Sequence, residues 1–138
     1  MREFSTFNEQ ETQAVGALLA SECGEGDFLA LYGEMGSGKT VFMRGFVGAL
    51  IPNALVSSPT YAILNVYEGE KICVNHFDMY RITSEEDLYS TGYEEAITRG
   101  ITVCEWTENI EDFLPKHYIR IVFSKRSENE RIISVERV

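Results

Sequence analysis

A glycine-rich stretch from Gly33 to Thr40 carries the residue types and the spacing that bind phosphate groups. It reads GEMGSGKT and fits the pattern GxxxxGK followed by serine or threonine. Its glycines allow the backbone to curl so that successive N–H groups point at phosphate oxygens, and a helix beginning near Gly38 adds the positive end of its dipole. The residues expected to contact the ligand are Met35, Gly36, Ser37, Gly38, Lys39 and Thr40.

Two side chains of this stretch have separate tasks, and the flanking elements must position them. Lys39 is expected to reach the β and γ phosphates of a nucleotide, and Thr40 to hold Mg²⁺. The apolar run from Phe28 to Tyr32 is typical of a buried strand, and after the loop apolar residues recur at helical spacing until Pro52. A glycine-rich turn with a chance lysine is the alternative, but strand, loop and helix follow one another in the order that phosphate binding requires.

Two acids compete for the metal side of such a site. Asp78 follows an alternating strand pattern, whereas Glu105 follows the continuous apolar run Ile101 to Cys104. A continuous run is expected of a parallel strand covered on both faces, which favours Glu105 as the acid that reaches Mg²⁺ directly or through water. Asp78 is left to orient or deprotonate the attacking water, or to join the outer shell of the metal. Either residue could instead be a surface acid.

Thr60 is a candidate for sensing the γ-phosphate. Pro59 disfavours helix at the residue before it, so Thr60 is expected at the start of a strand, on the loop where switch threonines of nucleotide hydrolases lie. A threonine that merely starts a strand is the alternative.

Three further residues near these acids could contribute to the site or to the structure around it. His76 is expected to be a hydrogen-bonded structural histidine rather than a catalytic base. Arg81 could face phosphate or pair with an acid, and the sequence does not choose between them. Trp106 could stack on a nucleotide or a partner, although a lone tryptophan is more often partly buried packing.

Length and composition set the class of protein. The 138 residues suit one domain spanning 1–138, and 44% hydrophobic with 25% charged residues is typical of a soluble globular protein. The opening residues lack a basic region followed by an apolar stretch, and no 18-residue apolar run exists, so we expect a cytoplasmic protein. The net charge of −10 disfavours direct, tight binding to nucleic acid unless a partner provides the basic surface, and the alternative is that the acidity only aids solubility. The three cysteines lack metal-ligand spacing and are expected to be buried, reduced thiols, with a redox or metal role as the alternative.

The remaining patterns predict short helices and antiparallel hairpins. Asn8 and Glu11 resemble a capping box for a first helix, and Thr83 and Glu86 resemble one for a short acidic helix. The other expected elements are an edge strand at 4–7, a hairpin of 61–67 with 71–77, a helix at 93–99, a short helix ending at 113, and closing strands at 117–123 and 131–138.

These residues together resemble the TsaE family, formerly called YjeE, over nearly the whole chain. Four ordered blocks carry the resemblance: 33–40, Ser58-Pro59-Thr60-Tyr61, His76-Phe77-Asp78-Met79-Tyr80-Arg81, and Glu105-Trp106. The first block alone indicates only a phosphate loop, and the other three are specific to the family. Met79 replaces a usual leucine and Thr107 a common proline, changes that affect packing more than chemistry.

The resemblance implies a fold and a function. The fold is α/β, a P-loop NTPase-like three-layer sandwich with a mostly parallel central sheet plus antiparallel hairpins. The function is slow hydrolysis of ATP to ADP with Mg²⁺, in support of the TsaB and TsaD proteins. These form N6-threonylcarbamoyladenosine beside the anticodon of tRNAs that read codons beginning with A, so tRNA would be met only indirectly.

The resemblance also implies roles for individual residues. Thr40 and Glu105 would form the Mg²⁺ side and Lys39 the phosphate clamp. Residues needed for hydrolysis or partner coupling would be Thr60, Asp78 and Trp106, and weaker candidates for the base or ribose side are Glu9 and Thr12.

Three other functions compete with this one. A nucleotide kinase needs a lid with several arginines, for which the chain has few unassigned basic residues. A GTPase is disfavoured because the stretch 124–127, SKRS, lacks an aspartate to read guanine. A nucleotide-dependent scaffold or switch, whose hydrolysis is incidental and whose bound state controls the shape of a partner, stays open.

Overall fold

One mixed sheet of seven strands runs through the protein. A computed structural model describes all 138 residues and gives the strand order β1-β7-β6-β2-β5-β4-β3. The strands are β1 (Arg2–Thr6), β2 (Phe28–Tyr32), β3 (Leu64–Glu68), β4 (Cys73–Asp78), β5 (Ile101–Glu105), β6 (Ile119–Lys125) and β7 (Arg131–Arg137). The central strands β6, β2, β5 and β4 are parallel, and antiparallel pairs complete both edges.

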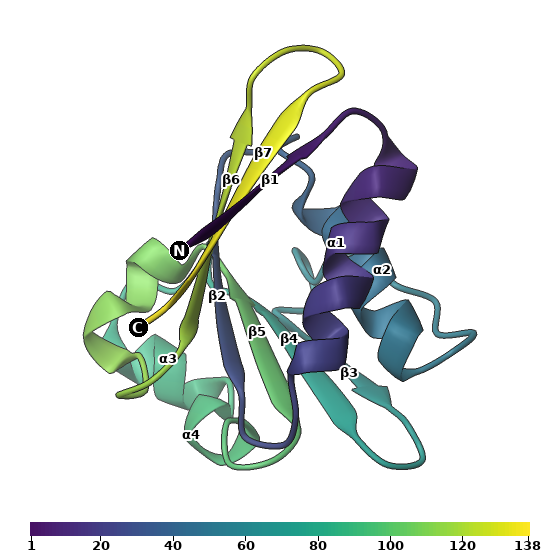
Figure 1. The fold of residues 1–138 in the computed structure, drawn as a ribbon. Coiled ribbons are helices and arrows are strands. Elements are labelled where there is room, and N and C mark those ends of the chain that lie inside the picture. The colour runs from purple at the N-terminus through teal and green to yellow at the C-terminus, as the bar shows by residue number, and fades with distance from the viewer.

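Helices cover both faces of this sheet (Figure 1). The helices α1 (Glu9–Glu22) and α2 (Lys39–Leu50) lie on one face, and α3 (Glu85–Ser90), α4 (Tyr93–Ala96) and the 3₁₀ helix η1 (Thr107–Phe113) lie on the other. The expected α/β fold of three layers, with a mostly parallel centre and antiparallel hairpins, is confirmed. No helix is long and apolar enough to cross a membrane.

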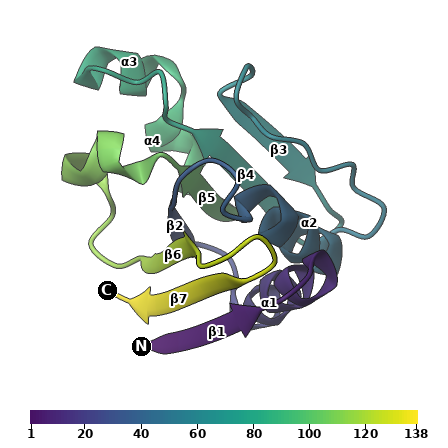
Figure 2. The same cartoon turned by 90° about the horizontal axis from the view of Figure 1, so that it is seen from above.

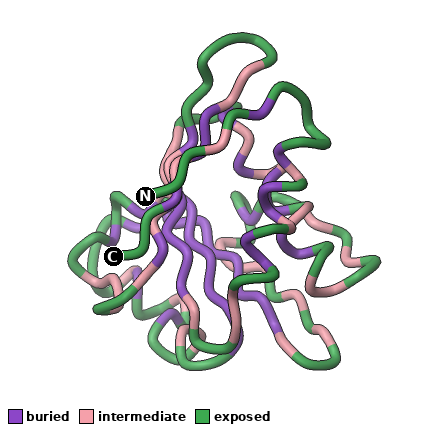
Figure 3. Tube along the Cα trace, in the orientation of Figure 1, coloured by how far each residue is buried: buried purple, intermediate pink, exposed green.

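The buried strand before the glycine-rich loop contributes to two separate cores. Leu29 and Leu31 face α1 and α2, whereas Phe28 and Ala30 face the opposite core. Successive side chains of a strand point to opposite faces, so a strand covered on both sides needs an apolar residue at every position. The central strands are accordingly buried, while the loops and outer helix faces are exposed (Figure 3).

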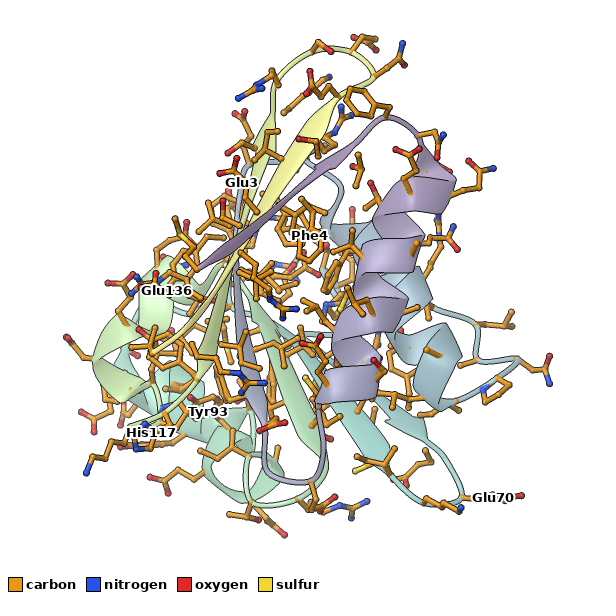
Figure 4. All side chains as sticks on the ribbon, in the orientation of Figure 1. Glu3, Phe4, Glu70, Tyr93, His117 and Glu136 are labelled. Carbon is orange, nitrogen blue, oxygen red and sulfur yellow. The ribbon has the colours of Figure 1, made fainter.

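The edge strand β1 alternates instead. Phe4 packs towards α1, and Glu3 points to the other side of the strand (Figure 4). An alternation of apolar and polar residues is expected where only one face of a strand is covered.

Two glycines allow α1 and α2 to pack closely. A Cβ at Gly16 would lie 2.2 Å from the carbonyl oxygen of Phe42, and one at Gly45 would lie 2.0 Å from that of Gln13. Such distances leave no room for any side chain. The contact holds Thr12 against the glycine-rich loop, since a Cβ at Gly38 would lie 3.7 Å from Thr12 Cγ2.

The strand expected to begin at Tyr61 begins instead at Leu64, so the prediction that Thr60 starts a strand is wrong. Residues 60–63 form a turn, in which the N–H of Ile63 donates to the carbonyl of Pro59 at 2.7 Å. Ile63 has φ +70°, a left-handed conformation that a β-branched residue rarely adopts. An alternating pattern does not reveal a turn that is closed by backbone hydrogen bonds.

The predicted helix starts were correct at one place and displaced at another. Asn8 caps α1, accepting from the N–H of Glu11 at 2.8 Å, while Glu11 accepts from the N–H of Phe7. The acidic helix α3 is capped by Ser84, which accepts from the N–H of Asp87, and not by Thr83 as expected. Both hydroxyl residues have an acid three positions on, so spacing alone could not choose between them.

Candidate functional site

The glycine-rich loop opens into a cleft of about 490 Å³ at the carboxyl ends of the parallel strands. We call it the glycine-loop cleft. All but one of the residues predicted from the sequence line it: Glu9, Thr12, Met35, Gly36, Gly38, Lys39, Thr40, Thr60, Asp78, Glu105 and Trp106. They come from separate segments, which meet because adjacent parallel strands end at the same edge of a sheet.

The loop depends on glycine at Gly33. Its φ is +147°, and a Cβ there would lie 2.8 Å from both the carbonyl oxygen of Phe123 and Ser37 Oγ. Ser37 is the predicted residue that does not line the cleft, because its side chain is buried inside the loop and its N–H donates to the carbonyl of Glu34. Ser37 Oγ has no hydrogen-bond partner.

Lys39 lines the cleft and is buried. Its Nζ donates to the carbonyl of Gly33 and lies 5.5 Å from the centroid of the Trp106 ring. Both contacts are favourable for an ammonium group, and neither neutralises its charge. An anion in the cleft would therefore find Lys39 close by and without a carboxylate partner.

Asp78 and Glu105 lie side by side at the ends of β4 and β5, where they are paired in the register of the two strands. Both are buried, with 5% and 6% of their surface exposed. Asp78 Oδ1 accepts from the N–H of Tyr80 at 2.8 Å, and Glu105 Oε2 lies 2.6 Å from His76 Nε2. Both acids line the same cleft, and carboxylates are the side chains that most often bind divalent cations such as Mg²⁺. His76 is hydrogen-bonded as expected, and its partner is Glu105.

Thr60 lies at the exposed rim of the cleft. Its hydroxyl is 2.6 Å from that of Ser58, which also lines the cleft. The turn that carries Thr60 is tied to the acids, because the N–H of Asp78 donates to the carbonyl of Ile63 at 2.8 Å. A backbone hydrogen bond therefore joins this turn to the strand end that carries Asp78.

Arg81 was expected to face phosphate or pair with an acid, and the structure gives it a different contact. Trp106 was expected to stack on a ligand or partner or to be partly buried packing. The guanidinium of Arg81 lies 5.3 Å from the centroid of the exposed Tyr61 ring and does not line the cleft. Trp106 is half-buried in a left-handed conformation, with φ +57°, and packs against Tyr80 with ring centroids 4.8 Å apart. It is thus partly packing and partly a wall of the cleft.

The turn between β6 and β7 was not predicted to take part, yet its residues Glu128 and Asn129 line the cleft with Arg131. Arg131 Nη1 donates to the carbonyls of Ser127, Glu128 and Glu130 at 3.0 to 3.3 Å and so holds the shape of the turn. Because β6 and β5 flank β2 on opposite sides, this turn lies across the loop from the acids. Figure 2 shows it beside the start of α1. A charged turn carries no spacing motif, so no signal in the sequence indicated it.

Two residues before α1 also line the cleft without having been predicted, namely Phe7 and Asn8. The predicted Thr12 lies beside them, but its hydroxyl is engaged with that of Thr6 at 2.7 Å and its methyl group faces the loop. This end of the cleft is therefore less polar than the residue types alone suggest.

The fold and the cleft define the class of protein: an α/β protein with one mixed sheet, whose cleft is built on a glycine-rich loop between a buried strand and a helix. A family model described as threonylcarbamoyl adenosine biosynthesis protein TsaE matches residues 6–133. The chain therefore belongs to the TsaE family, and the resemblance drawn from the four sequence blocks is confirmed.

Relatives from several bacteria agree with this assignment. The chain is 35% identical over 133 residues to a tRNA threonylcarbamoyladenosine biosynthesis protein TsaE of Bacillus subtilis, covering 96% of this chain and 83% of that protein. It is 33% identical to the protein of the same description from Rickettsia felis, covering 93% and 75%. The crystal structure of Bacillus subtilis YdiB superposes with a TM-score of 0.80 at 30% identity, covering 97% of this chain and 83% of that one.

Proposed function

We propose that this protein is a slow, Mg²⁺-dependent ATPase that supports the TsaB and TsaD proteins in forming N6-threonylcarbamoyladenosine in tRNA. The observation that carries the proposal is the convergence of Lys39 and Thr40 with Asp78 and Glu105 on one cleft. Phosphoryl transfer requires mainly positioning and charge stabilisation, and these are the groups that supply them. The family and the descriptions of its relatives support the pathway.

The residues present fit a Mg²⁺ ion shared with a nucleotide. No group of three or more His, Cys, Asp or Glu side chains could hold a metal alone. Mg²⁺ bound with nucleotides commonly takes one or two protein ligands together with phosphates and water, and Thr40 and Glu105 lie on the same cleft. When bound, the ion would neutralise charge on the β and γ phosphate oxygens.

The protein groups then divide the work. Lys39 would leave the carbonyl of Gly33 for a phosphate oxygen, because a charged acceptor binds an ammonium more strongly than a neutral one. Asp78 would orient the attacking water. The Thr60 hydroxyl at the rim would sense the γ-phosphate by contacting it when ATP is bound. Across the loop, Glu9, Thr12 and the β6–β7 turn would meet the base or ribose.

Slow turnover of the isolated protein follows from the placement of its arginines. Arg81 is stacked on Tyr61, and Arg131 lies across the loop from the acids with Nη1 bonded to carbonyls. Neither supplies an arginine finger, whose contribution to hydrolysis is about 10³- to 10⁵-fold. We propose that the partner proteins complete the site. With a net charge of −10, the protein would meet tRNA only through them, in the cytoplasm.

The same absence of an arginine finger beside the acids favours a second candidate, a nucleotide-dependent scaffold or switch whose hydrolysis is incidental. In that case the bound nucleotide sets the conformation of the Thr60 turn, and the partners read that conformation. A variant that binds ATP and cannot hydrolyse it separates the two functions, because a scaffold would still support tRNA modification.

The decisive experiment is reconstitution of tRNA modification from threonylcarbamoyl-adenylate, with TsaB and TsaD and with or without this protein. We expect several rounds of modification per complex only in its presence. Equal multiple turnover without it would refute the assignment. The exposed Arg44→Ala variant is the control, because Arg44 lies on α2 outside the cleft.

A further inference from the structure

The buried side chain of His76 has no role in the function proposed above, although it touches one of the principal acids. Its Nε2 lies 2.6 Å from Glu105 Oε2, and the two side chains are 1% and 8% exposed. A carboxylate oxygen can only accept, so Nε2 carries the proton and donates. His76 does not line the cleft, whereas Glu105 does.

The pairing of β4 with β5 places this histidine behind the acid. His76 is in register with Val103, so Glu105 lies two residues further along β5 on the same face. The neighbouring side chains on that face, Val74 and Val103, belong to the apolar core against α2. An apolar residue would pack at position 76 without the cost of burying a polar ring.

The histidine is also incompletely satisfied. Its Nδ1 is buried and has no hydrogen-bond partner, so the ring does not belong to a larger structural network. A purely structural histidine would be expected to use both nitrogens. The only hydrogen bond of the ring is the one to Glu105.

We propose that His76 is a positioning residue for metal binding. By holding Oε2 it fixes the rotamer of Glu105 and leaves Oε1 free to face the cleft. A glutamate whose conformation is already fixed does not have to be ordered when the ion binds, and hydrogen bonds from a second layer of residues commonly raise metal affinity about 10- to 100-fold. The inference rests on the proposed function, in which Glu105 serves Mg²⁺.

The test is the affinity for Mn²⁺, as a paramagnetic probe for Mg²⁺, measured by electron paramagnetic resonance with ADP bound. His76→Leu removes the donor and keeps an apolar side chain of similar size, and His76→Gln keeps an N–H donor at the end of a side chain of suitable length. We expect Mn²⁺ affinity to fall about 10- to 100-fold in His76→Leu and to be largely restored in His76→Gln. Affinity for ADP in EDTA should stay unchanged in both.

Matched variants separate the possible outcomes. Thr102→Val removes another buried, unpartnered polar atom, Thr102 Oγ1, on the neighbouring strand and should leave Mn²⁺ affinity at the wild-type value. Wild-type Mn²⁺ affinity in His76→Leu, or an equal loss of ADP affinity in EDTA, would overturn the positioning role. If His76→Leu does not fold, His76→Phe serves for the same comparison.

One further variant distinguishes this inference from the proposed function. Glu105→Gln should lose Mn²⁺ affinity whether or not His76 positions the acid. Loss in Glu105→Gln with wild-type affinity in His76→Leu refutes the positioning role alone. Wild-type affinity in both variants refutes the metal role of Glu105 as well.

Discussion

Asp78 and Glu105 end adjacent parallel strands as register partners, and both are buried at the cleft that contains the glycine-rich loop. They are 27 residues apart in sequence, and their proximity comes from the sheet alone. The two acids differ in their hydrogen bonds, in line with the different tasks that we propose for them. Asp78 is held by a backbone N–H at the end of its own strand, and Glu105 by the side chain of His76.

Glu105→Gln is expected to abolish Mg²⁺-dependent ATP hydrolysis, whereas Asp78→Asn should lower kcat and retain metal affinity. The reason is that we place Glu105 on the metal and Asp78 on the attacking water. Steady-state kinetics over a range of Mg²⁺ concentrations checks both variants. Wild-type rates in Glu105→Gln would show that Asp78 is the principal acid on the metal side.

Lys39→Ala should lower kcat about 10²-fold or more and leave the fold intact. The ammonium is bonded only to the carbonyl of Gly33 and lies over the ring of Trp106, so its loss leaves no carboxylate unpaired. Single-turnover hydrolysis and the thermal unfolding midpoint measure the two effects. A large fall in the unfolding midpoint would show that the lysine serves stability.

Thr60→Val should bind ATP and hydrolyse it about a hundredfold more slowly, and Thr60→Ser should be close to wild type. The hydroxyl lies on an exposed turn, so substitution removes a functional group without opening the core. Equal rates for the valine and serine variants would contradict a sensing role for this hydroxyl. The valine variant also provides the test for a scaffold in the reconstituted modification assay.

The double variant Glu128→Ala/Asn129→Ala should weaken ADP binding about three- to tenfold, the effect expected when one of the two side chains hydrogen-bonds the base or ribose. It should leave binding of inorganic tripolyphosphate unchanged, because these residues lie across the loop from the acids. Isothermal titration with both ligands makes the comparison. A parallel loss for tripolyphosphate would place the β6–β7 turn on the phosphates.

The thiols of Cys23 and Cys104 should react slowly with iodoacetamide at pH 8. Burial raises the pKa of Cys23 to about 11, with the charge of Asp27 adding to the effect, and burial raises the pKa of Cys104 as well. The reactive thiolate of Cys23 accumulates only as the pH approaches 11. Its rate at pH 8 should therefore be about two orders of magnitude below that of a free cysteine. Peptide mapping of the alkylated protein at several pH values gives the rates.

Local patterns were sufficient for several elements of this fold. The run Phe28 to Tyr32 predicted β2 with the correct bounds, and Ile101 to Cys104 predicted most of β5. In both cases the strand is buried on two faces, and the continuous apolar run in its own residues indicates this burial. The start of the first helix was also predicted correctly, because the cap residue Asn8 bonds to the N–H of Glu11, only three residues away.

The turn at Thr60 and the start of α3 were less predictable. The turn at Thr60 is closed by the backbone bond from Ile63 to Pro59, and Ser84 rather than Thr83 caps α3 because its hydroxyl accepts from the N–H of Asp87. Neither contact has a signature in the residues themselves, since several conformations satisfy the same spacing.

For this protein the sequence by itself determined the glycine-rich loop, its strand and helix, and the family, because these depend on residues that are close together or on ordered motifs. Only the tertiary structure decided that His76 contacts Glu105, that Arg81 lies over Tyr61, and that the β6–β7 turn lines the cleft. These relationships join segments that are distant in sequence. They follow from the strand order and register of the sheet, in which the free energy of packing is shared among many residues and is not encoded at any single position.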